Sequence, residues 1–166
     1  MTDSTRDENQ RATIRSLRQT LTAQLNDAEE GRVLCEICRL GTDTNDAADP
    51  RFLVMRLLRD HDLAPGPGDL IEMPRAIAER VAEDLFRGPL GGPSKRTDVE
   101  ARAAASSFFS LFDEGARFYS TWNYKIDAST RNLTYSGKPM LANSLESGLL
   151  VVDSSAVGCL LVGDED

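Results

Sequence analysis

Two of the three cysteines in this chain lie at the Cys-x-x-Cys spacing that metal sites and redox enzymes use, in the segment "VLCEICRLG" (residues 33–41). A structural zinc site needs four thiolate or imidazole ligands. Besides Cys35 and Cys38, the sequence offers Cys159 and His61, the single histidine. The ligands are just sufficient in number, so a zinc site formed by these four residues is one hypothesis.

The residues around the two cysteines favour a second hypothesis, packing in the core. Apolar side chains continue through the segment at Val33, Leu34, Ile37 and Leu40, and a buried free cysteine behaves as a small hydrophobic residue. We therefore expect a helix that ends at Gly41, with no bound metal and no other cofactor. Redox chemistry has less support because no strand-helix-strand pattern surrounds the pair.

The glycine-rich segment "GPLGGPSKRT" (residues 88–97) is a candidate anion-binding loop. Small residues let backbone amides converge on an anion, and the N-terminus of a following helix adds a favourable dipole. Lys95, Arg96 and Thr97 would supply the side chains. However, the Gly-Lys-Ser/Thr ending of a Walker loop is missing, and Pro89 and Pro93 have no amide proton to donate. We expect a plain linker and keep a small enzyme or nucleotide binder using residues 88–97 as an alternative.

Other catalytic arrangements are sparse in the sequence. A Ser-His-Asp or Cys-His site must use His61, which falls at the expected end of a helix, where a cation interacts favourably with the dipole. Glu79 and Glu83 are one helical turn apart and could act as a carboxylate pair. Arg75 and Arg80 lie near them and favour a solvated, salt-bridged face instead. We therefore predict that the protein is not an enzyme.

Charge disfavours some classes of partner. The 166 residues include 27 acidic and 19 basic ones, giving a net charge of -8. An acidic surface repels phosphate backbones and anionic lipid, so a nucleic-acid partner is unlikely. No apolar run approaches the roughly 20 residues that cross a bilayer, and the polar start lacks the apolar region of a secretory signal. We expect no membrane association and a cytoplasmic location.

The amino-acid composition also indicates what kind of genome encodes the protein. Arginine far outnumbers the three lysines, and aspartate and alanine are common. This pattern is typical of a GC-rich genome and is compatible with a salt-adapted host.

The expected secondary structure changes once along the chain, from helices to strands. We expect a polar tail over residues 1–9 and a single α+β domain over residues 10–166. Its helical part, residues 10–115, should contain four to five helices, including 50–62, 74–87 and 98–114, because apolar residues there recur at spacings of three and four. In the β-rich part, residues 116–163, the period becomes two, which predicts an antiparallel sheet of two hairpins.

The expected first helix carries a stripe of apolar residues at helical spacing, Ile14, Leu17, Leu21 and Leu25. This stripe could bind a protein partner or a second copy of the chain. The leading hypothesis is accordingly a non-enzymatic protein-binding subunit, an adaptor or a structural component of a larger assembly. A winged-helix-like DNA-binding regulator is a further alternative, because three helices followed by a hairpin match its order of elements, although the net charge has the wrong sign.

Overall fold

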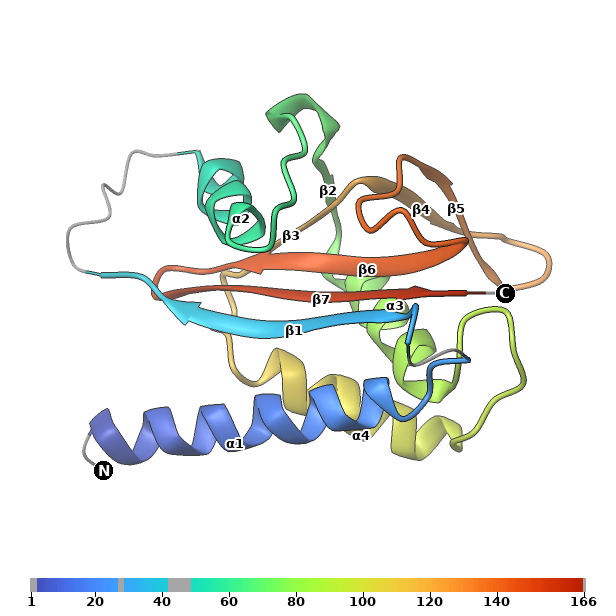
Figure 1. Cartoon of the computed structure of the whole chain (residues 1–166), viewed down its shortest axis with the longest axis horizontal. Helices are drawn as coiled ribbons and strands as arrows, with labels where there is room; N and C mark the ends of the chain where they lie inside the picture. Colours follow the sequence, from blue (N-terminus) through green and yellow to red (C-terminus); the bar gives the residue numbers. More distant parts are fainter. Residues whose placement is uncertain (1–2, 27–28, 42–48, 166) are drawn as a thin grey trace.

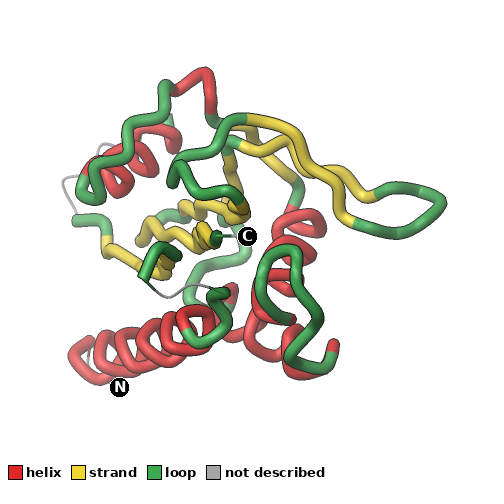
Figure 2. The backbone as a smooth tube through the Cα atoms, turned by 45° about the vertical axis from the view of Figure 1, so that its right-hand side comes forward, coloured by secondary structure: helices red, strands yellow, loops and turns green. Residues whose placement is uncertain are grey.

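The computed structural model describes residues 3–26, 29–41 and 49–165 of the chain. Its helices and mostly antiparallel strands confirm the α+β class. A five-stranded antiparallel sheet lies between helices on both of its faces, and a two-stranded arm stands apart from it (Figures 1 and 2). None of the helices in this part of the chain combines the length and the apolar character needed to span a membrane.

The elements follow one another in the order α1 (Asp3–Thr22), β1 (Arg32–Arg39), α2 (Pro50–Arg59), the short 3-10 helix η1 (Pro67–Asp69), β2 (Ile71–Met73), α3 (Arg75–Arg87), α4 (Asp98–Phe109), β3 (Arg117–Ser120), β4 (Trp122–Ile126), β5 (Leu133–Gly137), β6 (Leu145–Val152) and β7 (Ala156–Asp164).

The hairpin of β6 and β7 forms the centre of the sheet, whose strand order is β1-β7-β6-β3-β2. Alternate residues of this hairpin point to opposite faces. Leu149 and Leu160 join the core beneath α1, α3 and α4, and Leu150 and Leu161 join the core beneath α2. Both faces are therefore buried, which explains why these two strands are apolar without a polar residue at every second position.

Two helices, α2 and α4, begin at residues whose side chains cap them. Asp49 accepts a hydrogen bond from the backbone N–H of Arg51 at 3.0 Å, and Pro50 opens α2. At the start of α4, the Thr97 N–H donates to Glu100 Oε2 at 2.8 Å, while the Glu100 N–H donates to Thr97 Oγ1 at 3.2 Å. This capping box confirms the expected start of that helix.

The first forty residues differ from the prediction. The segment around Cys35 and Cys38 is the edge strand β1, not a helix, and it pairs with β7 along its whole length. Its apolar residues lie on both sides of the strand, since α1 covers one face and α2 the other. The part of the expected polar tail that the structure describes is helical, because α1 begins at Asp3.

The apolar stripe of α1 packs inside the molecule. Ile14, Leu17 and Leu21 are buried in the core formed with α3, α4 and the sheet, and Leu25 packs against it. The structure thus gives the expected interaction face a partner within the same chain.

In the expected β-rich part, residues 117–126 form two strands that are separated at Thr121. β3 belongs to the main sheet, whereas β4 lies outside it and, in the described part of the chain, pairs only with β5. The two expected hairpins therefore exist as β4-β5 and β6-β7, but they belong to different sheets. We call β4, β5 and the turn between them, residues 122–137, the arm. Figure 2 shows the arm projecting from the body of the molecule.

Candidate functional site

The four residues of the zinc hypothesis do not meet. Cys35 lies in the core under α1, while Cys159 lies in the core on the opposite face of the sheet, under α2. Cys38 is exposed, and His61 Nε2 lies 2.8 Å from Glu36 Oε2. Within the described residues, no group of three or more histidine, cysteine, aspartate or glutamate side chains could hold a metal ion.

Two of the three side chains proposed to bind an anion have structural roles. Arg96 donates to the side-chain oxygen of Gln24 and lies 3.4 Å from the carbonyl oxygen of Phe86, which fastens the glycine-rich segment to the end of α1. Thr97 caps α4. Lys95 is exposed, and its backbone N–H donates to the Arg87 carbonyl oxygen at 2.9 Å. The three side chains therefore do not converge on one point.

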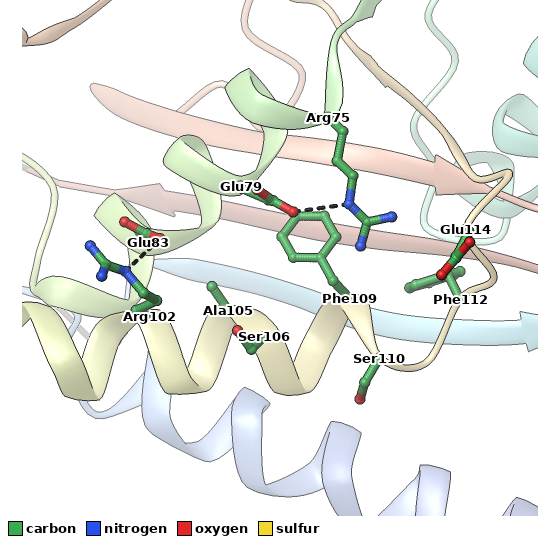
Figure 3. A pocket seen from close by; sticks show the side chains of 10 residues that line it. All are labelled: Arg75, Glu79, Glu83, Arg102, Ala105, Ser106, Phe109, Ser110, Phe112 and Glu114. Atoms are coloured by element: carbon green, nitrogen blue, oxygen red, sulfur yellow. Dashed lines mark hydrogen bonds and ion pairs between the residues drawn. The ribbon is translucent and has the colours of Figure 1, made fainter.

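A wide groove of about 630 Å³ runs between α3 and α4 (Figure 3). Its charged residues neutralise one another, because Arg75 Nε lies 2.9 Å from Glu79 Oε1 and Arg102 Nε lies 3.3 Å from Glu83 Oε1. The Arg75 guanidinium also lies over the Phe109 ring, 5.7 Å from its centroid. The salt-bridged face expected for Glu79 and Glu83 is thus present. The walls are helices, whose backbone groups are bonded internally, so the groove offers a ligand few unsatisfied groups.

A second hollow, of about 450 Å³, lies between the arm and the glycine-rich segment. We call it the arm cleft. Its lining comes from three parts of the chain: β5 and the preceding turn, one side of α3, and the loop after α3, with Ser147 of β6 as a further contact. These residues are Asn132, Leu133, Tyr135, Arg80, Asp84, Arg87, Gly88–Gly92, Ser94 and Ser147. The cleft falls within the usual size range of binding pockets.

The hydroxyl groups near the arm cleft are not arranged for nucleophilic catalysis. Ser147 Oγ lies 2.9 Å from the hydroxyl oxygen of Tyr124. Burial raises the pKa of Tyr124, so this phenol is not a base near neutral pH. His61, the single histidine, pairs with Glu36 and is not part of the lining. Ser147 therefore lacks the adjacent base that activates a serine nucleophile.

The side of β5 that faces away from β4 is an open strand edge. Backbone hydrogen bonds from Asp127 to Asn132 (2.9 Å) and from Lys138 to Thr121 (3.4 Å) bracket the β4-β5 ladder. In an antiparallel pair, directly opposed residues alternate between bonded and non-bonded. The N–H and C=O groups of Leu133 and Tyr135 consequently point away from β4, and no partner for them is recorded in the described part of the chain.

The two edges of the main sheet, β1 and β2, are less accessible to an incoming strand. At β1, the Arg18 guanidinium donates to the Cys35 carbonyl oxygen, with its Nη2 at 2.8 Å, and so blocks the middle of the edge. β2 has only three residues. Charged side chains and short length are the usual means by which proteins protect sheet edges. The edge of β5 has neither protection along Leu133–Gly137, and Tyr135 is 47% exposed.

Sequence reasoning missed Arg80, Leu133 and Tyr135 as site residues. The alternation that places Leu133 and Tyr135 on one face of a strand was readable, and the register confirms it. Which edge of a strand remains unpaired depends on the whole sheet, and no local pattern reports it. Comparisons with protein-family models, with curated proteins and with solved structures gave no match for this chain.

Proposed function

We propose that the protein is a non-enzymatic protein-binding component, which takes up an extended segment of a partner protein in the arm cleft. The observation that carries this proposal is the open edge of β5, where the backbone groups of Leu133 and Tyr135 are available beside a cleft lined by their own side chains. An added strand would form backbone hydrogen bonds with this edge, and the cleft would receive alternate side chains.

The cleft suits an extended segment better than a compact small molecule. Pockets for small molecules are concave and mostly apolar. This cleft has polar walls on α3, a glycine-rich wall with little side-chain bulk and a strand edge on the third side. The leucine stripe of α1 is a weaker choice, since a partner would have to displace it from the core.

The DNA-binding alternative has less support from the geometry. In the winged-helix arrangement, the helix before the hairpin would carry basic residues for the phosphate backbone. In α4, the last helix before the arm, the one basic residue is Arg102, and it pairs with Glu83 across the groove.

A random-peptide library displayed to the full-length protein tests the proposal. Selected peptides should bind with the backbone amides of Leu133 and Tyr135 protected from hydrogen exchange, and these amides should shift in NMR spectra. Selected peptides that leave the arm unperturbed, or an absence of binders at peptide concentrations up to about 1 mM, would refute it.

A pair of variants at one position separates the edge from the side chain. Tyr135→Pro and Tyr135→Ala both remove the aromatic ring, but only proline also removes the outward N–H, and an unpaired edge tolerates proline. Proline removes one backbone hydrogen bond to the peptide, and its pyrrolidine ring adds bulk at the strand edge. Tyr135→Pro should therefore weaken peptide binding about tenfold more than Tyr135→Ala does. Equal affinities for the two variants would show that the strand edge is not used.

A further inference from the structure

We infer that the segment bound in the arm cleft is the C-terminal tail of its partner, whose free carboxylate is received by Arg80. This inference rests on the proposed function and adds the chemistry of the ligand. Three observations support it. They are the unpaired amino groups of Arg80, the unpaired backbone N–H groups of the loop after α3, and the equal numbers of positive and negative side chains in the ion pairs of the cleft.

Among the described residues, both terminal amino groups of Arg80 lack a recorded partner, whereas one of the two terminal amino groups of Arg87 is paired. Arg87 pairs with Asp84 through Nη1 and with Asp98 through Nε, at 2.9 Å for the second contact. Arg80 makes its recorded contact through Nε alone, 3.2 Å from Asp84 Oδ1. Its two terminal amino groups have no recorded partner among the described residues, and its side chain is 32% exposed in the cleft. Two parallel N–H groups of a guanidinium match the two oxygens of a carboxylate.

The loop after α3, which lines another wall of the cleft, contains backbone N–H groups without a recorded partner in the described part of the chain. In the turn that follows α3, the Gly92 N–H donates to the Pro89 carbonyl oxygen at 3.2 Å. The N–H groups of Leu90 and Gly91 between them have no recorded partner within the described residues. Gly91 has φ of 69°, a conformation that a side chain would strain, so glycine maintains this turn. Successive free amides in such a turn favour an anion.

The charge of the cleft limits the anion to a weakly charged one. Arg80 and Arg87 are balanced by Asp84 and Asp98, so the surroundings are neutral in sum. A nucleotide or another multiply charged phosphate would meet Asp84 in the same wall and be repelled. A single carboxylate can bind Arg80 without such excess charge.

The experiment compares peptides of one sequence that differ only at the C-terminus. Peptides selected from random libraries with free C-termini, and from libraries of internal segments, are synthesised as free acids and as amides. Their dissociation constants are measured by calorimetry with the full-length protein and with Arg80→Gln. Lys95→Gln is the matched control, because it removes an exposed cation near the cleft that does not line it.

The expected result is that binders have free C-termini, and that amidation and Arg80→Gln each weaken binding about tenfold or more. Lys95→Gln should change affinity less than about twofold, since an exposed charge beside the site is screened. Equal binding of acid and amide would overturn the inference but leave the proposed function intact. The same holds for binders that depend on an internal acidic side chain. Absence of any binder would instead remove the proposed function and the inference with it.

Discussion

At the scale of single residues, two buried tyrosines differ in whether their hydroxyl groups have partners. Tyr119 is fully buried, and its hydroxyl oxygen has no hydrogen-bond partner among the described residues. The Tyr124 hydroxyl lies 2.9 Å from Ser147 Oγ and accepts the Gly148 N–H at 2.9 Å. Burial raises the pKa of both phenols, so both remain neutral near pH 7.

Replacing each tyrosine by phenylalanine should therefore have opposite effects on stability. Tyr119→Phe removes an unpaired buried hydroxyl and should leave the free energy of unfolding unchanged or raise it by about 1 kcal/mol. Tyr124→Phe leaves the Ser147 hydroxyl and the Gly148 N–H without their partner, and should lower it by about 1 to 3 kcal/mol. Urea unfolding measures both. Equal destabilisation by the two substitutions would mean that Tyr119 has a hydrogen-bond partner in the folded protein.

The three thiols should be chemically distinct. Burial raises the pKa of Cys35 to about 12, and Cys159 is also buried with a raised pKa. Cys38 is exposed, and its pKa is raised by partial burial and by the nearby Glu36 and Asp60 carboxylates. Because the thiolate is the reactive form, an aromatic disulfide reagent should label one thiol per native chain, faster as pH rises from 7 to 9.

Denaturation should make all three thiols reactive, and Cys38→Ser should abolish labelling of the native protein. Any reactive thiol in the native Cys38→Ser variant would contradict the burial of Cys35 or of Cys159. Because Cys38 lies on an exposed part of β1, Cys38→Ser should change the free energy of unfolding by less than about 0.5 kcal/mol. Cys35→Ser, which buries a hydroxyl, should lower it by about 1 to 3 kcal/mol.

At the scale of elements, the sequence predicted those whose signals are local. The apolar spacing of three and four located α2, α3 and α4, and in the structure the Asp49 cap and the Thr97 capping box mark the starts of α2 and α4. The change to a period of two located the β4-β5 hairpin.

β1 could not be identified from its apolar pattern alone. A strand covered on both faces has no polar alternation, so "RVLCEICR" resembles a buried stretch of helix. Its assignment depends on β7, more than a hundred residues later in the chain, which pairs with it from Arg32↔Gly163 to Arg39↔Ala156. The open edge of β5 escaped prediction for the same reason, since pairing between distant strands decides which edges remain free.

The turn at the tip of the arm depends on one carboxylate. Asp127 accepts hydrogen bonds from the backbone N–H groups of Ser129 (2.9 Å) and Thr130 (2.8 Å) and from both hydroxyl groups. These bonds, chiefly that of the Ser129 hydroxyl, lower the pKa of Asp127 to about 2. Since the pKa is lower in the folded turn, the stabilising contribution of Asp127 is complete above its ordinary value near 4 and is lost as pH falls through about 2.

An NMR titration of the Asp127 side-chain carbon should therefore give a midpoint near 2. The amide signals of Ser129 and Thr130 should shift with the same midpoint. In Asp127→Asn these amide shifts should vanish, while the rest of the arm keeps its β4-β5 register. A midpoint near 4 would show that the turn is not formed in solution.

At the scale of the whole molecule, the arrangement leaves the β5 edge of the arm open and protects the β1 edge of the main sheet. The sheet is covered by α2 on one face and by α1, α3 and α4 on the other, so association through its faces would require unfolding. Only edges can accept a further strand. Arg18 spans from α1 to β1, where its Nη2 donates to the Cys35 carbonyl oxygen at 2.8 Å and lies 3.7 Å from Glu36 Oε1. We interpret Arg18 as a residue that prevents a further strand from pairing with the β1 edge.

Arg18→Leu should accordingly expose the edge of β1 and promote pairing between copies of the chain. The Cys35 carbonyl then lacks a partner, and one positive charge that an approaching strand would have to displace is gone. Sedimentation velocity should show a concentration-dependent shift to larger species for Arg18→Leu.

Arg15→Leu is the matched control, because Arg15 is exposed on the same helix with no ion pair recorded in the described residues, and it gains the same apolar side chain. If both variants associate equally, added hydrophobic surface is the cause. Association of Arg18→Leu alone, reversed when Ile37→Pro removes an outward N–H of β1, identifies the strand edge as the contact.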